Sequence, residues 1–146
     1  MLDSENRHHQ RLQQYWDTLR AGRPYPNESD LDPKEIQDVW PSCFLVAIDA
    51  ATPHVGYRYS YLGPEMLEAY GEDQHNPDIV KLLSTDTAAM IAKFNEVVKT
   101  GKPVTDDSSF VNLKRINIRY RTCMLPLGGP DGSVSYIMGC MRWKTY

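Results

Sequence analysis

Three arginines recur along one stretch of the chain with a spacing that suits anion recognition. Arg115, Arg119 and Arg121 stand at odd positions, and apolar or aromatic side chains fill most of the even positions between them. Alternate side chains of a strand share one face, so the three guanidinium groups would lie together. Such groups bind phosphates and carboxylates through parallel hydrogen bonds. The alternative is a solvated sheet face that pairs with acidic residues elsewhere in the chain, and we favour that alternative.

A second set of residues combines aromatic, sulfur and aliphatic side chains that could line a ligand pocket between a long helix and a sheet. Rings and thioethers adapt to apolar ligands, but the same side chains also build ordinary hydrophobic cores. Plain core is the commoner role. The candidates are Tyr59, Met90, Phe94, Ile118, Tyr120, Met124, Tyr136 and Met138.

Catalytic and metal-binding chemistry find no support in the sequence. It contains no GxSxG elbow, no phosphate-binding loop and no HExxH motif. The four histidines do not stand at i, i+4 spacing, and the three cysteines form no CxxC and no pair with a histidine at metal spacing. We therefore expect no metal site, no cofactor and no enzyme, but reduced and packed thiols at Cys43, Cys123 and Cys140.

Length and charge narrow the class of protein further. The chain has 146 residues, enough for one domain with a real core, and a net charge of −3, which argues against a nucleic-acid partner. The charged residues within 28–49 are mostly acidic and those within 110–146 are mostly basic, so the two regions could pair. No apolar run is long enough for a membrane span, and residues 1–6 are unlike a signal peptide. We expect a cytoplasmic protein.

The first element is an amphipathic helix over residues 3–22. It carries one apolar stripe at i, i+3, i+4 and i+7, formed by Leu12, Tyr15, Trp16 and Leu19. The stripe either packs on the chain's own domain or also meets a second copy of the chain. We take these four residues as candidates for a dimer interface.

The remaining elements predict an α+β domain with one antiparallel sheet and helices gathered on one face. We expect residues 1–42 to form the helical leader and a Pro-rich linker, and residues 43–146 to form the domain. Strands are expected at 43–48, 55–62, 104–109, 116–124 and 133–143. Helices are expected at about 33–40, 66–70, 77–83 and 87–100.

This order of elements, together with one segment of the sequence, resembles a PAS domain. The segment is Tyr59-Ser60-Tyr61-Leu62-Gly63, running into Met66-Leu67-Glu68-Ala69-Tyr70-Gly71-Glu72-Asp73. The resemblance covers about residues 43–143. The leader resembles that of small bacterial proteins that carry one PAS domain and nothing else. One departure is Gly63, which stands near the place where the family usually has an asparagine at the end of the second strand.

The resemblance implies a five-stranded sheet with the first and last strands in its centre. The residues agree, because 44–48 is apolar on both faces, and Ile137, Met141 and Trp143 face away from Tyr136, Met138 and Cys140. We expect the long helix to cover one face. The leader helix is expected over Ile137, Met141 and Trp143, where it meets a second copy as a two-fold dimer.

The resemblance also implies a function: a non-enzymatic sensory or adaptor protein of signal transduction that binds another protein. The alternative is a receptor for a metabolite or nucleotide. An isomerase or dehydratase of the related cone-shaped folds would require a His–Asp or paired-carboxylate arrangement, for which the sequence offers no candidate. PAS domains that bind haem use a histidine on the long helix, and those that bind flavin covalently use a cysteine in the short-helix region. Residues 87–100 contain no histidine and residues 63–83 contain no cysteine. We therefore expect a colourless protein.

Overall fold

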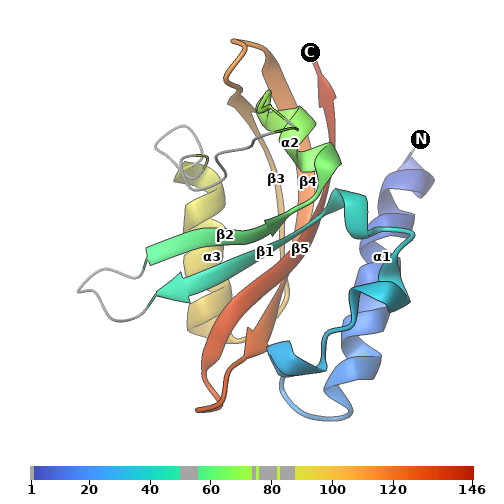
Figure 1. Cartoon of the computed structure of the whole chain (residues 1–146), viewed down its shortest axis with the longest axis vertical. Coiled ribbons are helices and arrows are strands. Elements are labelled where there is room, and N and C mark those ends of the chain that lie inside the picture. Colours follow the sequence, from blue (N-terminus) through green and yellow to red (C-terminus); the bar gives the residue numbers. More distant parts are fainter. Residues whose placement is uncertain (1, 50–55, 74, 76–81, 83–87) are drawn as a thin grey trace.

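The five strands of the computed structural model form one antiparallel sheet in the order β2-β1-β5-β4-β3 (Figure 1). The structure describes residues 2–49, 56–73, 75, 82 and 88–146. No helix within these ranges has the length and apolar character needed to cross a membrane. The elements in chain order are α1 (Leu2–Arg20), the 3-10 turns η1 (Glu28–Asp30), η2 (Pro33–Ile36) and η3 (Trp40–Ser42), β1 (Cys43–Asp49), β2 (Gly56–Leu62), α2 (Pro64–Tyr70), α3 (Ala88–Thr100), β3 (Val104–Val111), β4 (Asn117–Gly128) and β5 (Val134–Thr145).

The first and last strands lie side by side in the centre of the sheet. Cys43 of β1 pairs with Cys140 of β5, and Ala47 pairs with Tyr136. Phe44 belongs to a core on one face of the sheet, whereas Cys43 belongs to a core on the other. A strand buried on both faces is a continuous apolar run rather than an alternating one. The predicted α+β class and the central position of these strands are confirmed.

Two hydrophobic cores sandwich the sheet, and α1 and α3 lie on opposite sides of it (Figure 1). The α3 core lies between the sheet and α2 and α3. Its largest fully buried members are Phe44, Met66, Met90, Phe94, Ile118, Met124 and Ile137. The α1 core lies between the sheet and α1 with the 3-10 turns. Its fully buried members include Leu12, Ile36, Leu125, Leu127, Met138 and Cys140.

Helix α1 is anchored to the sheet by apolar contacts and by hydrogen bonds. Leu12, Tyr15 and Trp16 are buried in the α1 core, and the Trp16 indole Nε1 donates to the Pro126 carbonyl at 2.8 Å. The Tyr15 hydroxyl accepts from the Asp32 backbone N–H at 2.9 Å, which fixes the linker against the helix. The leader expected to end at residue 42 thus shares a core with the domain expected to begin at 43.

The expected position of the leader over the sheet was wrong in one respect. Ile137 and Met141 belong to the α3 core, and Trp143 packs against it, whereas α1 covers Met138 and Cys140. The alternation along β5 correctly separated the two sets of residues. Alternation shows which side chains share a face, but it carries no information about which helix covers that face.

A β-bulge in β2 separates Tyr57 and Tyr59 from Tyr61, although strict alternation along a strand would place all three on one face. The register between β1 and β2 shifts after Leu45, where Leu45 pairs with Tyr61 but Val46 pairs with Tyr59. One extra residue in a strand reverses the alternation beyond it. Tyr57 and Tyr59 therefore face the α3 core, and Tyr61 faces the α1 core, stacked on Trp40 with ring centroids 4.3 Å apart.

The start of the strand expected at 116–124 also differs from expectation. Ile116 is exposed and lies in the turn between β3 and β4, and β4 begins at Asn117. The side-chain Oδ1 of Asn112 accepts from the backbone N–H groups of Lys114 and Ile116 at 2.8 and 3.0 Å, so one amide organises the turn. Arg115 has a positive φ of 64° there.

Other boundaries agree within a few residues, with one difference in helix type. The segment expected as one helix at about 33–40 forms two 3-10 turns, η2 and η3. Pro41 has no N–H to continue an α-helix, and Asp32 caps η2 by accepting from the Lys34 N–H at 3.1 Å. Most of the helix expected at 77–83, and position 87 of the long helix, lie outside the described residues.

Candidate functional site

A continuous chain of aromatic rings runs through the α3 core. Adjacent rings in this chain have centroids 5.1 to 6.3 Å apart and are tilted or edge-on. This is the geometry that the ring quadrupoles favour. The rings come from strands β1, β2, β3 and β4 and from helices α2 and α3. In order they are Tyr57, Phe94, Phe44, Tyr59, Tyr70, Phe110 and Tyr120.

Two buried hydroxyl groups meet in the middle of this chain. The oxygens of Tyr59 and Tyr70 are 2.7 Å apart, and the Met90 sulfur lies 3.5 Å from the Tyr59 oxygen and 3.9 Å from the Tyr70 oxygen. Burial raises the pKa of both tyrosines well above the usual value, since a phenolate would be desolvated there. Both hydroxyls therefore stay neutral at physiological pH and hydrogen-bond to each other.

A third hydroxyl pairs with a carboxylate at the β3–β4 end of the ring chain. Tyr120 donates to Oδ2 of Asp106 at 2.7 Å, and both side chains are buried. Burial raises the Tyr120 pKa, and the hydrogen bond to Asp106 and the charge of that carboxylate raise it further. A buried carboxylate that accepts a strong hydrogen bond is a polar anchor within an otherwise apolar interior.

The structure brings together most of the predicted pocket residues and separates two of them. Tyr59, Met90, Phe94, Ile118, Tyr120 and Met124 all belong to the α3 core. Tyr136 and Met138 were expected in the same place but lie on the opposite face, in the α1 core. Their separation from Ile137 was visible in the alternation. The error was to combine both faces of β5 in one pocket.

The predicted set lacked five members of this site: Phe44, Tyr57, Tyr70, Phe110 and Asp106. Tyr70 ends α2 and Phe110 lies in β3, so neither shared an element with the predicted set. Asp106 lies in a strand whose burial alternates, at a position that faces inward. The alternation of Val104, Asp106, Ser108 and Phe110 was a signal that could have placed this carboxylate inside.

Comparison with known proteins identifies the fold. A family model described as a PAS domain matches residues 4–142. The chain belongs to the PAS domain family. The match includes most of α1, in agreement with the packing of that helix on the sheet.

Solved structures with the same fold include PAS and light-oxygen-voltage domains. The PAS domain of a protein from Colwellia psychrerythraea has a TM-score of 0.54 at 14% identity, over 77% of this chain and 96% of that chain. An RNA-binding light-oxygen-voltage receptor has a TM-score of 0.54 at 13% identity, over 78% of this chain and 33% of that chain. The light-oxygen-voltage (LOV) protein of Rhodobacter sphaeroides has a TM-score of 0.50 at 14% identity, over 77% of this chain and 68% of that chain. No curated protein matches the sequence significantly.

The departure at Gly63 has a steric cause in this PAS domain. Any Cβ at position 63 would collide with the Pro41 carbonyl, which crosses directly over the end of β2. The Gly63 N–H donates to the Cys43 carbonyl at 2.9 Å, so the strand end is held close to β1. The leader segment that precedes β1 therefore occupies the space that a side chain would need.

The basic face of this PAS domain differs from expectation: it lacks one predicted arginine but gains two basic residues from β5. Arg115 lies in the β3–β4 turn and does not share the strand face with Arg119 and Arg121. On β5, Lys144 lies directly opposite Arg119, and Arg142 lies opposite Arg121. Arg121 contacts Asp107 at 3.2 Å, and Arg142 contacts Glu65 at 3.9 Å. We call Arg119, Arg121, Arg142 and Lys144 the basic patch.

The predicted dimer-interface residues are largely used within the protomer. Leu12, Tyr15 and Trp16 are buried in the α1 core, and Leu19 is half-buried against it. A symmetric contact through this stripe would require α1 to leave its own sheet. The stripe therefore serves the core of the chain itself.

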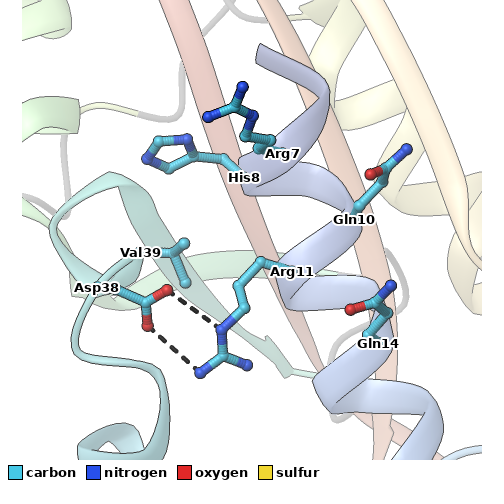
Figure 2. A pocket seen from close by; sticks show the side chains of 7 residues that line it. All are labelled: Arg7, His8, Gln10, Arg11, Gln14, Asp38 and Val39. Atoms are coloured by element: carbon cyan, nitrogen blue, oxygen red, sulfur yellow. Dashed lines mark hydrogen bonds and ion pairs between the residues drawn. The ribbon is translucent and has the colours of Figure 1, made fainter. Parts of the chain in front are cut away.

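The other side of α1 forms a groove with the 3-10 turns (Figure 2). The groove has a volume of about 450 Å³ and is crossed by Arg11, whose Nε lies 3.1 Å from Oδ2 of Asp38. Arg11 Nη2 also donates to the Glu35 carbonyl at 2.6 Å. Figure 2 shows the guanidinium facing the carboxylate in a two-point contact. Because Arg11 and Asp38 neutralise each other, their ion pair serves mainly to hold α1 against the linker.

One buried cluster brings a histidine together with two cysteines, although no such pair stands at metal spacing in the sequence. His9 from α1 lies beside Cys123 and Cys140 of the sheet, and all three side chains are buried. Their separation in sequence hid this cluster, because no spacing rule relates residues 9, 123 and 140.

Proposed function

We propose that this PAS protein is a non-enzymatic sensor or adaptor in cytoplasmic signal transduction that acts by binding another protein. The observation that carries the proposal is the packing of the α3 core. Tyr59 pairs with Tyr70, and Tyr120 pairs with Asp106, so the polar groups of the ring chain bind one another. An interior whose polar groups are already paired favours a protein that signals through its surface over one that binds and converts a substrate inside.

The surface that we assign to the partner is the basic patch. Like charges directly opposite each other on neighbouring strands repel and weaken a sheet. Asp107 and Glu65 offset the charges of Arg121 and Arg142, whereas the Arg119–Lys144 pair is more easily explained by an external acidic ligand than by stability. Guanidinium groups bind carboxylates in a fixed two-point geometry. The proposed partner is thus an acidic segment of a signalling protein.

Native mass spectrometry of protein purified from its own host tests the proposal. Apart from any metal ion, the expected mass is that of the chain, or of a homodimer, with no added organic molecule. A copurified organic molecule, released on denaturation at near one-to-one stoichiometry, would instead establish a receptor. The receptor is our second candidate, because Asp106 and the tyrosine hydroxyls offer polar anchors in an aromatic interior.

Charge reversal separates the surface from the interior. The double variant Arg119→Glu, Lys144→Glu should lose a partner captured by the tagged wild-type protein. Lys102→Glu, an exposed cation before β3, should retain it. Equal retention by all three proteins would overturn the assignment of the basic patch. Sedimentation at tens of micromolar tests the homodimer expected from the sequence in the same preparations, and a monomer there would contradict that expectation.

A further inference from the structure

The α1 core contains a cluster of three side chains that typically ligate soft metal ions. One donor atom each of His9, Cys123 and Cys140 lies within 4.8 Å of the other two. The two sulfur atoms are 3.8 Å apart. The residues are 8%, 2% and 0% exposed, so the cluster is closed to bulk water.

The secondary structure places each of these donors. Cys123 and Cys140 are directly opposite each other on β4 and β5, and both face α1. His9 precedes Leu12 by three residues and Trp16 by seven, so it extends the buried stripe of α1 by one helical turn. The helix thus supplies one donor over the two that the sheet supplies.

The geometry points to a binding site for a thiophilic metal ion, and we propose that His9, Cys123 and Cys140 are its protein ligands. Two thiolates bound to one tetrahedral ion at about 2.3 Å each are about 3.8 Å apart, the spacing that Cys123 and Cys140 already have. Thiolate and imidazole together select Zn²⁺ and Cu⁺ over Mg²⁺ or Ca²⁺. The surrounding side chains are apolar, among them Leu125 and Met138.

Binding is a proton-exchange step that requires no oxidant. The ion displaces the proton of each thiol, two metal–sulfur bonds replace two S–H bonds, and the protons pass to the buffer. The imidazole donates its lone pair without further change. Because His9 comes from α1 and both cysteines come from the sheet, the bound ion would join α1 to the sheet. The site therefore couples metal availability to the attachment of the leader helix.

The third cysteine provides a matched control. Cys43 lies on the other side of Cys140 across β1 and β5, and it is buried in the same core. Its sulfur instead donates to the Val39 carbonyl at 3.2 Å. Cys43→Ser removes a buried thiol of the same core without removing one of the three ligands.

Titration of the reduced apoprotein with metal alone tests the site. Co²⁺ is the probe for the Zn²⁺ arm, through its thiolate charge-transfer and d–d absorption bands, and Cu⁺ is followed by competition with a coloured chelator. We expect one ion per chain in at least one arm, a metal-dependent rise in Tm, and retention of both in Cys43→Ser. Loss of at least tenfold in affinity is expected for Cys123→Ser, Cys140→Ser and His9→Leu. Unchanged binding in these three variants, or no binding in either arm, overturns the proposal.

Two measurements on the unaltered protein keep the test independent of variant folding. X-ray absorption of the loaded protein should show two sulfur ligands and one imidazole nitrogen. Hydrogen exchange of backbone amides in α1 should slow when the metal is added. An ion with oxygen ligands only, or exchange in α1 that the metal leaves unchanged, contradicts the assignment. A mass lower by two hydrogens after aerobic purification, with a Cys123–Cys140 crosslink and no metal uptake after reduction, would show a redox pair instead.

Discussion

Tyr59 and Tyr70 show how single residues make the interior of this PAS domain specific. Two hydroxyls in an apolar core are costly unless they satisfy each other, and here their oxygens are 2.7 Å apart. Each ring also continues the aromatic chain from Phe44 to Phe110. The pair therefore fixes the relative positions of β2 and α2, which carry the two side chains.

Removal of both hydroxyls of this pair should cost less than the sum of the two single removals. Tyr59→Phe leaves the Tyr70 hydroxyl buried with only the Met90 sulfur at 3.9 Å, and we expect a loss of about 1–3 kcal/mol in the free energy of unfolding. The double variant with Tyr70→Phe should lose less than the sum of the single variants. Urea unfolding of all four proteins completes the cycle. Strict additivity would show that the hydroxyls act independently.

The buried tyrosines also predict alkaline lability. Burial raises the pKa of Tyr59, Tyr70 and Tyr120 in the folded state above the unfolded value of about 10. Their contribution to stability is therefore complete below pH ~10 and is lost as the pH rises toward the folded pKa values. Tm should fall above that pH, and phenolate absorbance should rise together with unfolding. Tyr70→Phe should flatten the fall, whereas Tyr146→Phe, at a side chain 68% exposed, should not.

Among elements, α1 closes the α1 core against the sheet. Trp16 is buried and donates to the Pro126 carbonyl, and Leu12 is fully buried in the same core. The helix covers the side of β4 and β5 that α2 and α3 leave open. Without α1, residues such as Leu125 and Met138 would be exposed to water.

The element-scale prediction is that α1 stabilises the protomer itself. Trp16→Ser with Leu19→Ser should lower the free energy of unfolding by at least about 3–5 kcal/mol, the usual cost of removing a buried Trp. The loss of stability should appear in chemical unfolding at every protein concentration, including that of a dilute sample. Gln13→Ser, on the exposed side of the same helix, is the control. Loss of association with unchanged unfolding would instead place the stripe between two protomers.

The basic patch belongs to the ends of β4 and β5 and should matter little for folding. Arg119→Ser with Arg121→Ser should change the free energy of unfolding by about 0–1 kcal/mol, since exposed ion pairs such as Arg121–Asp107 contribute little. If the patch binds anions, phosphate should raise the Tm of the wild-type protein and not that of the variant. The absence of any phosphate effect on the wild-type protein would contradict the anion-binding role.

The elements were largely predictable because hydrophobic period and helix-capping residues are local signals. Several patterns lie within one element each: the apolar run 43–48, the stripe of α1 and the alternation along β4. The bulge at β2, the Asn112 turn and the side of the sheet that α1 covers depend on contacts between elements, which a single strand pattern does not encode. The site followed the same rule. Tyr59 and Phe94 were found from their own elements, but Asp106 and His9 were not.

At the scale of the whole molecule, the PAS fold is shown, and its cofactor content stays a prediction. Protein purified in the dark should have no visible absorption band at near one-to-one stoichiometry. The long helix lacks the histidine of haem-binding relatives, and residues 63–83 lack the cysteine of covalent flavin binding. Absorption spectra and a pyridine haemochrome assay check this. A copurified chromophore released by denaturation would contradict it.

The central place of β5 has a consequence for the synthesis of the protein. Ile137 of β5 pairs with Val46 of β1, and Leu125 of β4 pairs with Met138, so the last strand joins the two halves of the sheet. A nascent chain that has not yet released β5 from the ribosome has β1–β2 and β3–β4 as separate pairs, each exposing an unpaired edge. The sheet can therefore close only after β5 has been translated. Chains that stop before β5 should be substrates for chaperones and proteases rather than partly folded and active proteins.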